Sequence, residues 1–243
     1  MKRHLLLVLF LVIAAVCTSL SARTYALVIG VSNYGNEENN LAQTTKDAKA
    51  FKEVMLTQTK DVTLLTSKYA NKSNIMAKLK NICSTAKSSD RIVFYYSGHG
   101  MSGGIYCYDG LISYTELVNA LSKSSAKYKI CFIDACHAGT AASATQGGKT
   151  VETAVKGQSD QIFFVGCRSD EYSFENPWVG AGFFTQALIK GMRGKSDTNA
   201  DKKITVLELF KYIYSDVVSR SQSLQHPQLI ASKSLYDVVV FTW

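Results

Sequence analysis

The stretch KICFIDACHAG, residues 129–139, combines a strand pattern with a candidate reactive group. Its apolar centre, residues 130–133, carries no charge and is typical of a strand that is covered on both faces. Such strands form parallel sheets, in which ligands bind beyond the carboxyl ends of the strands. Cys136 stands just after this run. The stretch therefore predicts a buried strand with a cysteine at the edge where binding sites form.

Apolar runs alternate with helical patterns along the rest of the chain, as in parallel strands joined by crossover helices. We expect strands within residues 24–34, 61–67, 90–100, 127–139, 160–170 and 236–243. We expect helices within residues 44–58, 71–87, 114–122, 183–194 and 205–221, the first of them behind a threonine cap. Residues 103–113 read as a hairpin. The fold class is α/β, with a mostly parallel sheet flanked by helices.

A second expected strand also ends in a polar motif. In SGHG, residues 97–100, His99 stands between two glycines directly after the apolar run IVFYY. If the two strands are neighbours, His99 and Cys136 share one edge, where an imidazole can activate a thiol for attack on a carbonyl group. The backbone amides of Gly100 and Cys136 can then hold the oxyanion. The alternatives are a surface histidine and a packing cysteine.

The motifs SGHG and DACHAG together resemble those of the caspase and metacaspase superfamily of cysteine peptidases. The segments YALVIGVSNY, TKDAKAF, FFVGCRSDEYSFE and GAGFFTQALIKGMRG are similar to the same superfamily and follow its order. The resemblance implies a caspase-like three-layer sandwich with a mostly parallel central sheet of about six strands. It also implies that His99 is the catalytic histidine, that Cys136 is the nucleophile, and that no cofactor is required.

The residue two positions before the cysteine bears on specificity. Animal caspases have glutamine there, whereas this chain has Asp134, and a carboxylate favours a cationic residue before the scissile bond. Resemblance to metacaspases implies that Asp134, Asp47 and Ser97 line a pocket for Arg or Lys. Thr44 departs from the cysteine that many metacaspases have at its place. The alternatives are a strand-end cap for Asp134 and a solvated or capping helix carboxylate for Asp47.

The N-terminus has the three parts of a signal peptide: basic MKRH, apolar LLLVLFLVIAAV, and CTSLSA with its small residues. We expect residues 1–22 to be removed by cleavage near Ala22, leaving one peptidase domain over residues 23–243. The protein is then exported, either periplasmic or secreted. An uncleaved membrane anchor is the alternative, although the apolar run is short for a span. A lipoprotein attached through Cys17 is a weaker one.

The charge distribution and the cysteine and histidine counts argue against several classes of binding partner. The formal net charge is +8, but the basic residues are spread along the chain without an aromatic–basic stripe, so we expect no nucleic-acid partner. Five cysteines remain after signal removal, and an odd count in an exported protein implies at least one free thiol or an intermolecular bridge. No CxxC pair exists and only four histidines occur, so a structural zinc site is not expected. We assign no disulfide and no oligomeric state.

The segment DTNADKKITVLE, residues 197–208, has the spacing of an EF-hand-like calcium loop. Its candidate ligands are Asp197, Asn199, Asp201 and Glu208. However, Lys202 replaces the glycine that permits the sharp turn. The alternative is an Asp/Asn turn and a helix whose capping box pairs Thr205 with Glu208. Calcium therefore enters as a candidate activator only, in this loop or elsewhere, and no metal is assigned.

Residues 137–160, after Cys136, are small and polar at first, as in a surface loop, and caspase relatives are often cut there. Lys149 and Lys156 are candidate self-cleavage sites within the 140–160 loop. The predicted function is a cysteine endopeptidase that acts on peptides or proteins after Arg or Lys. Two alternatives stay open: a catalytically silent caspase-like scaffold that binds partners, and a thiol acyltransferase or transpeptidase using the same dyad.

Overall fold

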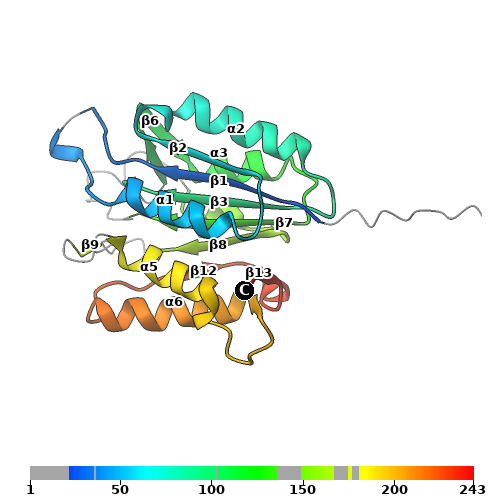
Figure 1. Ribbon diagram of the computed structural model, residues 1–243. Coiled ribbons are helices and arrows are strands. Elements are labelled where there is room, and N and C mark those ends of the chain that lie inside the picture. Colours follow the sequence, from blue (N-terminus) through cyan, green and yellow to red (C-terminus); the bar gives the residue numbers. More distant parts are fainter. Residues whose placement is uncertain (1–21, 36, 102, 136–148, 167–174, 177–180) are drawn as a thin grey trace, which may run out of the picture.

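A six-stranded sheet runs through the middle of the molecule in the computed structural model (Figure 1). The structure describes residues 22–35, 37–101, 103–135, 149–166, 175–176 and 181–243. The strand order is β12-β8-β7-β3-β1-β2, and neighbours are parallel except for β12 beside β8. The bounds are β1 Thr24–Gly30, β2 Val62–Thr66, β3 Arg91–Ser97, β7 Tyr128–Asp134, β8 Gln161–Val165 and β12 Gln228–Ile230. The predicted mostly parallel sheet is confirmed.

Helices cover both faces of this sheet (Figure 1). On one face lie α2 Lys72–Thr85, α3 Tyr114–Leu121 and α4 Val151–Val155. On the other lie α1 Thr44–Met55, α5 Phe183–Lys190 and α6 Val206–Arg220. Side chains of β3 alternate between the two cores, so that Tyr96 belongs to the first and Tyr95 to the second. The result is the expected three-layer α/β sandwich.

Aromatic rings fill the core beneath α1. Phe51 of α1 stacks on Tyr95 of β3 with the ring centroids 4.2 Å apart, and Phe132 of β7 stacks on Phe164 of β8 at 4.9 Å. All four residues are fully buried. Burying a ring of this size stabilises the fold by about 2–3 kcal/mol. This packing fixes α1 against the strands that carry the candidate site.

The start of α1 differs from the prediction. Its N-cap residue is Gln43, whose side chain makes no capping bond, so the expected threonine cap is wrong. Instead, the Thr44 hydroxyl donates to the carbonyl oxygen of Val31 at 2.7 Å, and the Thr45 amide donates to the Ser32 hydroxyl at 3.0 Å. The threonines thus tie α1 to the loop after β1, and this tertiary contact takes the place of a local cap.

Short elements complete the fold. The expected hairpin is present as a three-stranded sheet of β4 Gly100–Met101, β5 Gly104–Cys107 and β6 Gly110–Ser113. Two further pairs of short strands are β9 Glu175–Asn176 with β10 Ala181–Gly182, and β11 Lys203–Thr205 with β13 Val239–Thr242. The single-turn elements are Glu37–Asn39, Ser67–Tyr69, Lys233–Leu235 and a π turn at Gly191–Lys195. The expected last strand therefore exists as β13, but it lies outside the main sheet, whose edge is β12.

The predicted signal peptide falls almost entirely outside the described residues, which begin at Ala22, so its cleavage stays a prediction. Within the described part of the chain, no helix has the length and apolar character needed to cross a membrane.

Candidate active site

The candidate site lies at the carboxyl ends of β1, β3 and β7. The register pairs Ser97 with both Gly30 and Asp134, and the Gly98 amide donates to the Asp134 carbonyl oxygen at 3.2 Å. These three strands therefore end level with one another, and His99 follows β3 by the same number of residues as Cys136 follows β7. Cys136 itself lies outside the described residues, which stop at Ala135 and resume at Lys149.

His99 is held through both its backbone and its ring. Its amide donates to the Tyr34 hydroxyl at 2.6 Å, and the two rings are 4.7 Å apart. The ring Nε2 lies 2.8 Å from the carbonyl oxygen of Asn39. Because a carbonyl oxygen only accepts, Nε2 carries the proton in this contact. In a neutral ring, Nδ1 is then the atom that can take a proton.

The loop before His99 packs tightly on tyrosines. The buried hydroxyl of Tyr96 lies 2.6 Å from the carbonyl oxygens of both His99 and Tyr106. Burial raises the pKa of Tyr96, which keeps the phenol protonated as a donor. A Cβ atom on Gly98 would lie 2.6 Å from the Tyr34 hydroxyl and 2.7 Å from Cζ of Tyr96. Glycine is needed here because the two tyrosines approach the backbone closely.

Gly100, the expected oxyanion donor, begins β4 opposite Ile105. The neighbouring bond runs from the Tyr106 amide to the His99 carbonyl oxygen at 2.9 Å. In an antiparallel ladder bonded and non-bonded pairs alternate, so the Gly100 amide faces away from β5. This orientation is compatible with an oxyanion donor.

Asp134 lies under the first turn of α5 and is buried, with 7% of its surface exposed. Its Oδ2 accepts hydrogen bonds from the Thr185 hydroxyl at 2.6 Å and from the Thr185 amide at 3.2 Å. The alternative of a cap at the end of the strand therefore holds in one respect, because Asp134 caps a helix. That helix is distant in the sequence. The N-terminus of α5 favours the negative charge of the carboxylate.

Asp47 approaches the same helix end from α1. It is 2% exposed, so the solvated alternative is wrong, and its Oδ2 accepts the Gly182 amide at 3.3 Å. A Cβ atom on Gly182 would lie 2.8 Å from Oδ2 of Asp134 and 3.6 Å from Oδ2 of Asp47. The backbone at Gly182 therefore packs closely against both carboxylates, and only a residue without a side chain fits there.

Ser97, the third expected pocket residue, is 1% exposed and shares the α1 face of the sheet with Tyr95. The pKa of Tyr95 is raised well above its usual range by burial and then by the charges of Asp47 and Asp134. Hydrogen bonds with Thr185 and Ser97 lower the pKa of Tyr95. The structure thus brings Asp47, Ser97 and Asp134 into one cluster, and their role as a pocket for Arg or Lys stays a prediction.

Sequence reasoning missed Tyr95 and Thr185 in this cluster. The Tyr95 hydroxyl and Thr185 Oγ1 are 2.6 Å apart although 90 positions separate the residues. The one available signal was a tyrosine within an apolar strand, because a buried phenol usually finds a hydrogen-bond partner. Nothing in the sequence identifies that partner as Thr185.

The candidate calcium loop uses its polar groups internally. The Asp197 carboxylate accepts from the Asp201 and Lys202 amides at 3.3 Å and 2.9 Å, and Thr205 and Glu208 form the expected capping box. Lys202 adopts a φ of 61° and so makes the turn without glycine. Among the described residues, no group of three or more His, Cys, Asp or Glu side chains is placed to hold a metal ion. The loop as arranged does not fit a cation, and calcium activation elsewhere stays a prediction.

The candidate self-cleavage residues flank α4. Lys149 and Lys156 are both exposed, and Lys156 is the residue that ends the helix. A peptidase can reach exposed side chains of this kind, whereas residues 140–148 lie outside the described part of the chain.

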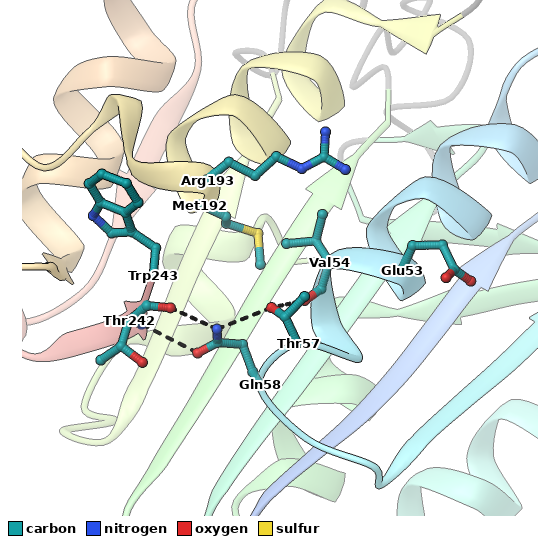
Figure 2. Close-up of a pocket in the computed structure, with 8 residues that line it drawn as sticks. All are labelled: Glu53, Val54, Thr57, Gln58, Met192, Arg193, Thr242 and Trp243. Carbon is teal, nitrogen blue, oxygen red and sulfur yellow. Dashed lines mark hydrogen bonds between the residues drawn. The ribbon is translucent and has the colours of Figure 1, made fainter.

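A separate cavity of about 550 Å³ lies at the far end of α1, between that helix and the C-terminus. Figure 2 shows Gln58 at its base, bonded to the carbonyl oxygen and amide of Thr242 at 2.7 Å and 3.3 Å. Asp47 and Met55, at the end of α1, are eight residues apart, which corresponds to a rise of about 12 Å along the helix. This cavity is therefore distinct from the rim that carries His99 and Asp134.

Comparisons with known proteins agree with this geometry. A family model described as "Caspase domain" matches residues 23–238. Protein GSU0716 from Geobacter sulfurreducens superposes with a TM-score of 0.67 at 17% identity, covering 90% of this chain and 98% of that one. Caspase-1 from Spodoptera frugiperda superposes with a TM-score of 0.64 at 18% identity, covering 87% and 89%. The curated proteins contain no match.

Proposed function

Because the chain belongs to the caspase domain family, we propose that it is a cysteine endopeptidase that cleaves after Arg or Lys. The observation that carries the proposal is the register of β3 with β7, which pairs Ser97 with Asp134. His99 and Cys136 thereby follow neighbouring strands at equivalent positions. Catalytic groups in parallel sheets gather at such strand ends.

In the proposed reaction, Nδ1 of His99 takes the proton of the Cys136 thiol, and the thiolate attacks the peptide carbonyl carbon. The amides of Gly100 and Cys136 stabilise the oxyanion. His99 then protonates the departing amine, which leaves a thioester on Cys136. Water releases the acid product after giving its proton to Nδ1. The contact from Nε2 to Asn39 supports this role by holding the ring in one tautomer.

The proposed specificity follows from the two buried carboxylates beside Gly182. A guanidinium or ammonium group that reached these carboxylates would pair with Asp134 and Asp47, whereas an aspartate side chain would meet two like charges. A cationic residue before the scissile bond is therefore the favoured substrate.

Two accessory proposals accompany this activity. The protein acts after export and removal of residues 1–22, and it processes itself after Lys149 or Lys156. The exposure of both lysines supports the second proposal. Intact mass measured on active wild type and on the Cys136→Ala variant tests it, and an intact active wild-type chain contradicts it.

The deciding experiment uses residues 23–243 and fluorogenic peptides ending in Arg, Lys or Asp, under reducing conditions, with and without calcium. We expect turnover of the Arg and Lys peptides that the Cys136→Ala substitution abolishes. Turnover of the Asp peptide contradicts the assignment of the pocket. No turnover contradicts the peptidase and favours a binding scaffold, and an added amine that captures the acyl group identifies a transpeptidase.

A further inference from the structure

The hydroxyl groups of Tyr95 and Thr185 form a chain of hydrogen bonds that ends at the Asp134 carboxylate. The Tyr95 hydroxyl contacts Thr185 Oγ1 at 2.6 Å, and Thr185 Oγ1 contacts Asp134 Oδ2 at 2.6 Å. The carboxylate only accepts, so Thr185 donates its single hydroxyl proton to Asp134. The Tyr95 phenol must then donate to Thr185. All the hydrogen bonds point toward the carboxylate, and such a chain strengthens its members cooperatively.

We propose that Thr185, backed by Tyr95, is a positioning residue that sets the preference for Arg and Lys by fixing the Asp134 carboxylate. This inference rests on the proposed function and goes beyond it, because it places a specificity determinant on α5 and outside the two motifs. Thr185 does not contact the reacting atoms. It acts through Asp134.

The geometry suits Thr185 to this role. Both its hydroxyl and its amide bond to the same oxygen of Asp134, which fixes the carboxylate in position and in rotation. Thr185 is fully buried in the first turn of α5. Water therefore does not replace these bonds easily when the hydroxyl is lost.

Tyr95 keeps the Thr185 hydroxyl aimed at Asp134. The phenol is fully buried and stacks on Phe51, so its own position is set by the core. It occupies the acceptor side of the Thr185 oxygen, which leaves the Thr185 proton for Asp134. The phenol is also held protonated by its raised pKa, whose main cause is burial. The chain of hydrogen bonds is thus fixed at Tyr95, its end remote from Asp134.

The test compares Thr185→Val, which keeps the shape and removes the hydroxyl, with Thr185→Ser, which keeps the hydroxyl. We expect Thr185→Val to lower kcat/KM for Arg and Lys peptides by about 10-fold or more, mainly through KM, because a hydrogen bond to a charged group is lost. Thr185→Ser should stay within about 3-fold of wild type. The rate at which iodoacetamide alkylates Cys136 should not change, since it reports the dyad and not the pocket.

A second variant guards against misfolding. Thr185→Val removes the hydroxyl 2.6 Å from the buried Tyr95 phenol, so the double variant Tyr95→Phe/Thr185→Val removes both groups and should fold with the same loss of Arg and Lys turnover. Equal kcat/KM for the valine and serine variants overturns the inference, whether both match wild type or both fall by the same factor. A wild type without Arg or Lys turnover overturns the proposed function as well, which separates the two failures.

Discussion

The substitution Gly98→Ala tests whether the backbone before His99 is fixed by close packing. Gly98 needs no left-handed backbone conformation, so the effect of a methyl group comes from contacts alone. The added Cβ would lie 2.6 Å from the Tyr34 hydroxyl and 2.7 Å from Cζ of Tyr96. Both rings would have to move, although Tyr96 is fully buried.

The expected loss of stability has three parts. Overpacking in a filled core costs about 1–3 kcal/mol. Moving the tyrosines breaks two hydrogen bonds to the backbone of His99, each contributing about 1 kcal/mol. The lower entropy of alanine in the unfolded chain offsets about 0.4–1 kcal/mol. The free energy of unfolding should therefore fall by about 2–5 kcal/mol.

Urea unfolding followed by circular dichroism measures this change, and Gly110→Ala is the matched control. Gly110 is exposed in the neighbouring hairpin, and a Cβ atom there meets nothing within 4 Å. The control should stay within about 1 kcal/mol of wild type, on the stabilising side if it moves. Peptide turnover should fall in Gly98→Ala and persist in Gly110→Ala. Equal unfolding midpoints and equal turnover for both variants would refute the close-packing argument.

Three further substitutions or measurements test other contacts. Gly182→Ala should lower the urea unfolding midpoint and lower Arg and Lys turnover at least about 10-fold, because the added Cβ atom would lie 2.8 Å from Oδ2 of the buried Asp134 and displace this carboxylate. Unchanged turnover would show that the position of the carboxylate does not matter for these substrates. Asp160→Asn should lower the free energy of unfolding by about 2 kcal/mol, since it removes the charged partner 2.5 Å from the buried Lys129 ammonium. An unchanged free energy of unfolding in a urea titration would mean that Lys129 reaches solvent. Burial raises the pKa of Cys83 to about 11, so the neutral thiol predominates below that pH. Labelling of Cys83 by iodoacetamide, followed by peptide mass spectrometry, should therefore be slow at pH 7.5 and become faster as the pH rises. Fast labelling at pH 7.5 contradicts the burial of the thiol.

The elements with long apolar runs could be predicted from the sequence, and those fixed by tertiary contacts could not. The run at 130–133 predicted β7 because both of its faces are buried. The edge strand β12 has three residues and follows Pro227, so neither its length nor its composition stands out.

The same division holds at the candidate site. His99 follows a recognisable strand and stands in a glycine-flanked motif, so its place at the rim was predictable. The bonds among Tyr95, Thr185 and Asp134 join three separate segments, and only the folded chain brings them together. The threonine cap failed for a similar reason, because Thr44 found a partner in the loop after β1.

The register of β7 with β8 has a consequence for a chain that is cut between them. Five residue pairs join these strands side by side, and the bond from Thr185 to Asp134 crosses the same boundary. Severing the backbone at Lys149 or Lys156 would leave every one of these contacts in place. The two fragments would share both hydrophobic cores and behave as a non-covalent heterodimer, which separates only when it is denatured.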